Sequence, residues 1–180
     1  MKIIKVIGIG ILILIAIPLI VALFVKKDYA VEKEIVINRP HHAVYNYVVL
    51  LKNQNNYSKW ATMDPKMKKT FKGTDGTVGF VSRWESSDSD VGTGEQEILK
   101  IIPGSRIDYE LRFIEPMKSK DFAYMLVDSL APNQSIVKWG FSGKMTYPSN
   151  LTLLFMDISA MIGNDFSEGL SHLKSILETE

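Results

Sequence analysis

Two polar side chains in the middle of the chain have the positions that a binding or catalytic contact needs. Gln96 and Tyr109 each belong to a segment in which polar and apolar residues alternate, and both fall on the side that we expect to face inward. A buried amide or phenol requires a hydrogen-bond partner, which is another side chain, a water or a ligand. Gln96 and Tyr109 are therefore candidates for orienting a reactive carbonyl, and equally for simple recognition of a bound molecule.

The other chemically capable residues favour structural roles. His41 and His42 are adjacent, so their side chains point in different directions at a helix start, and we expect exposed helix-terminus residues rather than metal ligands. Asp64 precedes Pro65, a pair that more often begins a turn than places a carboxylate at a pocket mouth. With three His and no Cys in the chain, we expect no metal site, no thiol nucleophile and no disulfide. No GxSxG motif supports a hydrolytic triad.

The stretch "GFVSRWESSDSDVGTGEQEI" at 79–98 places charged, aromatic and glycine residues close together. Strand alternation directs Trp84 inward and sends Arg83 and Glu85 to solvent, which weakens the apparent ion cluster. "SSDSD" is typical of a hairpin tip, and Gly92 and Gly94 then begin a returning strand with a bulge or bend. The segment is not a phosphate loop, because no lysine and no helix follow the glycines.

The amino-terminal segment favours a membrane anchor. Residues 6–25, "VIGIGILILIAIPLIVALFV", carry no charge, and such a length of helix spans about 30 Å, the hydrocarbon thickness of a bilayer. A signal peptide has a shorter apolar core and a small-x-small cleavage site, neither of which is present. A buried core helix would need burial on all sides. We therefore expect a retained single-pass anchor that contacts the bilayer.

Charge gives little further direction. Lys2 and Lys5 precede the span and Lys26 and Lys27 follow it, so the positive-inside bias is nearly even, and we place the remaining chain on the extracytoplasmic side. The net charge of +1 provides no field that would attract nucleic acid. We expect no nucleic-acid partner, and the sequence identifies no protein partner.

Downstream of the span, the hydrophobic period predicts one α+β domain. A strand ends near Asn38, and Pro40 suits the first turn of a following helix. A second short helix or turn is expected around Tyr57 and Trp60. Residues 67–147 then alternate in segments separated by turn formers, which is typical of an antiparallel meander of about six strands. Apolar residues at helical spacing from 158 to 177 predict a long final helix that covers the sheet.

This order of elements resembles the START-like, polyketide cyclase/dehydrase superfamily called SRPBCC. The resemblance rests on "EIVINRPHHAVYNYV" at 34–48, "NYSKWATMDPKMKKTFKGTDGTVG" at 56–79, "WESSDSDVGTGEQEILKIIPGSRIDYEL" at 84–111 and "DFSEGLSHLKSILE" at 165–178. It implies a helix-grip fold, in which a curved antiparallel sheet of about seven strands wraps a long C-terminal helix. It also implies a cavity between sheet and helix for an apolar or amphipathic ligand.

Alternation selects the residues that would form the wall of such a cavity. Aromatic and aliphatic groups with a few hydrogen-bonding side chains are usual in ligand sites, although the same side chains could simply fill a core. The expected wall consists of Phe80, Ser82, Trp84, Gln96, Ile98, Tyr109, Leu111, Phe113, Val137, Trp139 and Phe141 from the strands, facing Ile158 and Ile162 from the final helix.

We therefore predict an anchor at residues 1–27 and an SRPBCC-like domain at residues 28–180. The predicted function is binding of a lipid or polyketide-like small molecule beside the bilayer, without a cofactor. One alternative is an enzyme of the polyketide cyclase/dehydrase type, in which Tyr109 or Gln96 assists by hydrogen bonding. Another is a regulatory or protein-interaction module whose cavity is filled by its own side chains.

Overall fold

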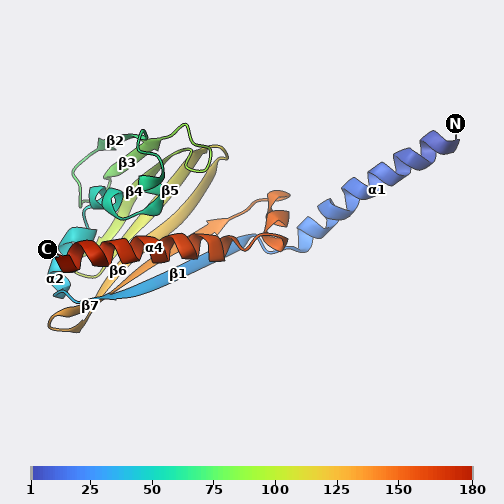
Figure 1. Cartoon of the computed structure of the whole chain (residues 1–180). Helices are drawn as coiled ribbons and strands as arrows, with labels where there is room; N and C mark the ends of the chain where they lie inside the picture. Colours follow the sequence, from blue (N-terminus) through green and yellow to red (C-terminus); the bar gives the residue numbers. More distant parts are fainter. Residues whose placement is uncertain (1, 180) are drawn as a thin grey trace.

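A computed structural model of the chain describes residues 2–179 (Figure 1). A single helix at the amino terminus leads into a sheet-and-helix body, which we call the globular body (residues 28–179). The elements in chain order are α1 (Lys2–Phe24), β1 (Asp28–Ile37), α2 (His41–Val48), the 3-10 helix η1 (Leu51–Asn56), α3 (Lys59–Met63), β2 (Lys68–Lys72), β3 (Val81–Glu85), β4 (Thr93–Ile102), β5 (Arg106–Glu115), β6 (Ser119–Ala131), β7 (Gln134–Lys144), the 3-10 helix η2 (Ser149–Leu154) and α4 (Ile158–Thr179).

The seven strands form one antiparallel sheet with the order β1-β7-β6-β5-β4-β3-β2. The first strand pairs with the last, from Asp28 opposite Lys144 to Ile37 opposite Ser135. Helices α2, η1 and α3 then carry the chain to the other edge, and β2 to β7 follow as a meander of hairpins. The six strands expected between residues 67 and 147 are all present.

Helix α4 runs along the concave face of the sheet (Figure 1). Its predicted apolar stripe is the side that packs inward, and Phe166, Leu170, Leu173 and Leu177 are buried there. Gly169 allows a close approach to the sheet, because a Cβ at this position would lie 2.9 Å from Cζ3 of Trp139. A larger residue here would displace the Trp139 ring.

The most deeply buried part of the core combines residues of α2, of the sheet and of the carboxyl-terminal half of α4. Val44 and Val48 of α2 and Leu173 of α4 press on Ile107 and Met125 of the sheet, and all five are essentially inaccessible to solvent. The backbone N–H of Asn38 donates a 2.7 Å hydrogen bond to the Glu178 carboxylate, which ties the end of β1 to the end of α4. We call this the closed end of the globular body.

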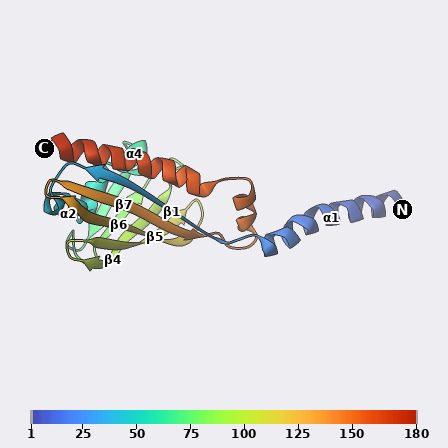
Figure 2. The ribbon, with the colours of Figure 1, turned by 90° about the horizontal axis from the view of Figure 1, so that it is seen from below.

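Helix α1 projects away from the globular body in both views (Figures 1 and 2). Residues Ile3–Phe24 form a helix of 22 residues with a mean hydropathy of 3.1, and only 6% of its most apolar window is buried. Such a helix is long and apolar enough to cross a membrane. It leaves the globular body from the end of the sheet opposite the closed end.

Candidate functional site

A cavity of about 560 Å³ lies between the concave face of the sheet and the first half of α4. Loops from η1 and α3 cover one side, and the turn between β5 and β6 borders another. The cavity reaches the ends of the strands where α1 joins the globular body. We call this the open end, in contrast to the closed end described above.

Most of the wall predicted from the sequence surrounds this cavity. The residues in question alternate along β3, β4, β5 and β7, so their side chains share the concave face. The predicted residues that line the cavity are Ser82, Trp84, Gln96, Leu111, Phe113, Trp139, Phe141 and Ile162.

The other predicted wall residues lie elsewhere. Phe80, Ile98, Tyr109 and Val137 also face inward, but they are almost fully buried in the core toward the closed end. Ile158 is half-buried at the start of α4 and does not line the cavity. Alternation identifies the inward face correctly, but it carries no information on whether the space opposite each residue is hollow or filled.

Tyr109 lies in the core, whereas Gln96 lies at the cavity wall. The Tyr109 ring is 2% exposed, and burial, followed by the nearby Tyr57, raises its pKa well above the ordinary value for a phenol. Gln96 lies two residue pairs along the same two strands, opposite Leu111, and its side chain lines the cavity. Only Gln96 of the two candidate polar residues therefore contacts the hollow space.

Aromatic rings form much of the cavity wall. Trp139 stacks on Phe166 with ring centroids 4.3 Å apart, and Trp60 meets the edge of Phe166 at 5.7 Å. On the opposite side Trp84 packs edge-on against Phe113 at 5.8 Å. All three tryptophans of the chain thus line the cavity. A ligand entering this space would change the environment of each indole.

The structure adds polar wall residues that the sequence reasoning missed. Lys69 lines the cavity, its Nζ donates a 2.9 Å hydrogen bond to the Ala61 carbonyl, and burial lowers its pKa. Asp121 is 3% exposed and accepts a 2.7 Å bond from the Ser119 hydroxyl. Burial, followed by the charge of Asp121, raises the pKa of the adjacent Tyr29 to about 12.

A sequence signal existed for one of these residues. Asp121 has the same parity along β6 as Ala123, Met125 and Val127, so alternation would have placed it inward. Nothing comparable distinguishes Lys69, because Lys68 and Lys72 belong to the same short strand. The cavity wall is therefore largely apolar and aromatic, with ammonium, carboxylate and amide groups at separate points, among them Lys69, Asp121 and Gln96.

The acidic hairpin after β3 behaves partly as expected. Trp84 faces the cavity, Gly92 has a φ of +62°, and the register shifts between Thr93 and Gly94, as a bulge there requires. The expectation of a weakened ion cluster is wrong. Arg83 pairs with Glu85 at 2.9 Å, because residues two apart on one strand lie on the same face of the sheet.

This outer ion network continues across the sheet. Arg83 also contacts Glu95 at 3.1 Å, and Arg112 pairs with Glu95, Glu97 and Glu110 at 3.1, 2.7 and 2.8 Å. The pairs join β3, β4 and β5 on the convex side, directly behind the hollow part of the concave side. We call this set the outer ion network.

Two further sequence candidates have structural roles. Asp64 accepts bonds from the Lys66 N–H at 2.8 Å and the Ser86 hydroxyl at 2.6 Å, so it stabilises the turn expected at Asp64-Pro65. His41 is half-buried rather than exposed, and its Nε2 lies 3.2 Å from the Val127 carbonyl. Within residues 2–179, no group of three or more His, Cys, Asp or Glu has a metal-binding arrangement.

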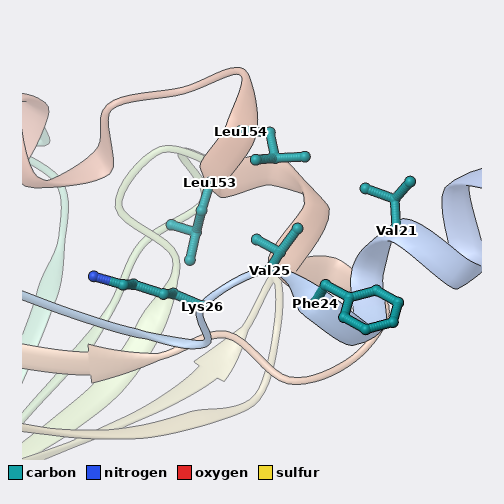
Figure 3. A pocket seen from close by; sticks show the side chains of 6 residues that line it. All are labelled: Val21, Phe24, Val25, Lys26, Leu153 and Leu154. Atoms are coloured by element: carbon teal, nitrogen blue, oxygen red, sulfur yellow. The ribbon is translucent and has the colours of Figure 1, made fainter.

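A second hollow of about 470 Å³ lies where α1 meets the globular body (Figure 3). Val21, Phe24 and Val25 from the α1 end and Leu153 and Leu154 from η2 supply its apolar walls. This hollow is more open than the cavity and contains no aromatic stack or buried polar group. We consider it a feature of the α1 junction rather than a binding site for a small molecule.

Comparison with solved structures gives the fold. The chain is similar to Ara h 8.0201, with 15% identity, a TM-score of 0.59 and coverage of 85% of this chain and 99% of that one. It is also similar to the Aha1 dimer from Colwellia psychrerythraea, with 17% identity, a TM-score of 0.55 and coverage of 83% and 96%. A protein from Mesorhizobium loti gives 14% identity, a TM-score of 0.59 and coverage of 84% and 98%.

These likenesses confirm the helix-grip fold predicted from the sequence. At such low identity they show the fold alone, and they carry no activity or ligand over to this chain. No protein-family model and no curated protein sequence matches the chain. The function must therefore be argued from the cavity and from α1.

Proposed function

We propose that this protein is a membrane-anchored SRPBCC-type binder of an apolar or amphipathic small molecule, held in the cavity beside α4. Residues 1–27 would serve as the anchor and residues 28–180 as the binding domain. The observation that carries the proposal is the cavity itself. A volume of about 560 Å³ with aromatic walls and a few convergent polar groups has the size and composition of a small-molecule site.

The wall chemistry supports an amphipathic ligand over a purely apolar one. Trp84, Phe113 and Trp139 offer ring faces to a hydrocarbon or polycyclic body. Gln96 and Lys69 offer an amide and an ammonium to a polar group, and no carboxylate pairs with Lys69 within residues 2–179. A lipid or a polyketide-like molecule has both kinds of surface.

A retained α1 is supported by its contact with the globular body. The Asn150 side chain donates to the backbone carbonyls of Ala22 and Val25 at 2.7 and 3.1 Å. Removal of α1 as a signal peptide would take away the first of these acceptors and leave a buried amide with one partner fewer. We place the protein as a single-pass membrane protein, with the globular body on the extracytoplasmic side.

An enzyme of the polyketide cyclase/dehydrase type is the second candidate, because Gln96 and the buried Asp121 carboxylate both border the cavity. Tyr109 has no part in this version, since its ring lies in the core. Conversion of a bound candidate substrate, followed by mass spectrometry, separates an enzyme from a binder. A module with a filled interior is disfavoured by the hollow volume.

The direct test is native mass spectrometry of the full chain extracted in a mild detergent, with identification of co-purified lipids. A reproducible bound molecule is expected. Titration with a panel of lipids and apolar probes should also change the fluorescence of Trp60, Trp84 and Trp139. Failure of both measurements, with no bound species and no fluorescence response, would overturn the proposal.

A cavity-filling variant sharpens this test. Ala123 lies on the cavity wall and is 7% exposed, so Ala123→Phe should place a ring in the ligand space and abolish co-purification. Ser142→Phe, on the exposed outer face of the neighbouring strand, is the matched control and should retain the ligand. Ser82→Leu provides a second filling variant on another strand, should Ala123→Phe not fold.

A further inference from the structure

An exposed apolar segment lies beside the carboxyl end of α1. Leu154, Phe155 and Met156 follow β7 in the connection to α4, and they are 54%, 83% and 43% exposed. Residues 149–156, "SNLTLLFM", contain no charged side chain. Three consecutive large apolar residues turned outward in one short connection are unusual for a surface that only water covers.

Asn150 fixes this segment to α1. Its side chain is completely buried, and its amide donates to the carbonyls of Ala22 and Val25. These carbonyls belong to the last turn of α1 and to the residue after it, where a helix has no partners of its own. The connection after β7 therefore caps α1 and cannot move independently of it.

Side chains from both elements border the junction hollow (Figure 3). Val21 and Phe24 of α1 face one side of it, while Leu153 and Leu154 of η2 face the other. Lys26 lies at the border toward the globular body. The apolar surface of α1 thus continues without a polar break onto η2.

We infer that the segment Leu153–Met156 is a second membrane contact, which inserts into the acyl boundary of the bilayer next to α1. This inference rests on the proposed anchoring of α1. A spanning helix that ends at Phe24, followed by Lys26 and Lys27, reaches the headgroup level at these residues. Because η2 is held to the same turn by Asn150, its exposed apolar side chains lie at that depth, where partly buried apolar segments are stable.

Two membrane contacts would fix the orientation of the globular body relative to the bilayer. If α1 alone entered the membrane, the globular body could rotate about residues 25–27. With η2 also in contact, the body is attached to the membrane at two points. The open end of the cavity borders the same end of the sheet as α1, through Tyr29, Lys144 and Thr146. The entrance is thereby held toward the bilayer surface, so the occupant of the cavity would be drawn from the membrane.

The chain contains no cysteine, so single cysteines can be labelled without a background. We would introduce Leu14→Cys, Phe155→Cys and Ser129→Cys separately into the full chain, attach an environment-sensitive fluorophore, and reconstitute each into phosphatidylcholine nanodiscs with and without a spin-labelled acyl chain. Ser129 is exposed near the β6–β7 hairpin at the closed end and serves as the matched control. Leu154→Cys is a second position in η2.

We expect the labels at 14 and 155 to lose about twofold or more of their fluorescence to the quencher, and the label at 129 to lose none. Quenching at 14 with none at 155 and 154 would overturn the inference and leave the anchor intact. No quenching at 14 would instead overturn the anchoring on which both proposals rest. Fluorescence at 155 that responds to protein concentration and not to the quencher would mean that a second copy covers η2, which also overturns the inference.

Discussion

The closed and open ends of the space between the sheet and α4 are built from the same strands in different ways. At the closed end α2 and the last turns of α4 both press on the sheet, and Ile107, Met125 and Leu173 are fully buried. At the open end only the first half of α4 and the loops cover the sheet, and a cavity of about 560 Å³ remains. The core therefore fills one half of this space and leaves the other half hollow.

Ion pairs on the convex side of the sheet compensate for the weaker interior packing at the open end. The outer ion network joins β3, β4 and β5 behind the cavity, with Arg112 at its centre. The Arg112 and Glu110 side chains are 31% and 11% exposed, so this part is less screened than most surface pairs. Cross-strand ion pairs thus hold strands that interior packing supports less.

The largest expected effect is a difference between two residues of β5. Ile107→Ala, at the closed end, should lower the free energy of unfolding by about 3 kcal/mol, because a packed core relaxes little around a new void. Leu111→Ala, at the cavity wall, should cost about 1 kcal/mol, since this side chain already borders a hollow and loses fewer contacts. Guanidinium unfolding of the full chain in detergent, followed by tryptophan fluorescence, measures both. Equal costs would contradict the contrast between the two ends.

The outer ion network should give the next largest effect. Arg112→Leu leaves Glu97 without a cation and removes one of two cations from Glu95 and from Glu110, so it should lower the free energy of unfolding by about 1 to 2 kcal/mol. Lys120→Leu is the matched control, because Lys120 is 61% exposed and its one ion pair among residues 2–179 is with Glu110. We expect a cost of about 0.5 kcal/mol or less for this change. Equal free energies of unfolding for the two variants would contradict a stabilising role of the outer ion network at the open end.

Acid should weaken the same region. Hydrogen bonds from Lys120 and then Arg112 lower the pKa of Glu110, while the hydrogen bond from Arg83 lowers the pKa of Glu85. Burial alone would raise the pKa of Glu95, but its bonds to Arg83 and Arg112 outweigh this and lower it. A carboxylate whose pKa is lower when folded stabilises the fold above its unfolded pKa of about 4.3, and this stabilisation is lost as the pH falls through the folded value.

The free energy of unfolding should therefore decrease between pH 5 and pH 3, by less than the effect of Arg112→Leu. The Arg112→Leu variant should show a shallower decrease over this range, because its carboxylates titrate closer to their unfolded values. Denaturant midpoints at half-unit steps of pH measure the two slopes. Parallel slopes would show that the acid sensitivity arises elsewhere in the molecule.

The smallest expected effect is a difference in ligand affinity between variants of Gln96 and Tyr109, the two polar residues that the sequence placed on one face. Gln96→Met keeps the length of a cavity-wall side chain but removes its amide, and it should weaken ligand binding by about three- to tenfold. Tyr109→Phe removes a hydroxyl from the core and should change affinity by less than about twofold. Titration of tryptophan fluorescence with the co-purified molecule measures both. A larger loss for Tyr109→Phe would extend the binding site into the closed end.

The sequence predicted the fold because each element has a local signal. The charge-free run from 6 to 25 predicts a helix by its length and composition. The alternation in β5 and β7 and the apolar stripe on α4 follow from the strand and helix periods of the backbone. The meander needed only short turns between successive strands. The order of elements and the inward parity of Ser82, Trp84 and Gln96 could therefore be predicted from the residues, and the resemblance to SRPBCC proteins then implied the helix-grip fold.

The division into an open and a closed end was decided only by the tertiary structure. Tyr109 and Leu111 have the same parity on one strand, yet α2 and distant turns of α4 fill the space opposite one and leave a hollow opposite the other. Asn150 lies more than a hundred residues from the carbonyls that it caps, and Arg83 and Arg112 each reach Glu95 only across paired strands. Periodicity fixes the direction of a side chain, but what it meets there depends on the packing of elements that are remote in the chain.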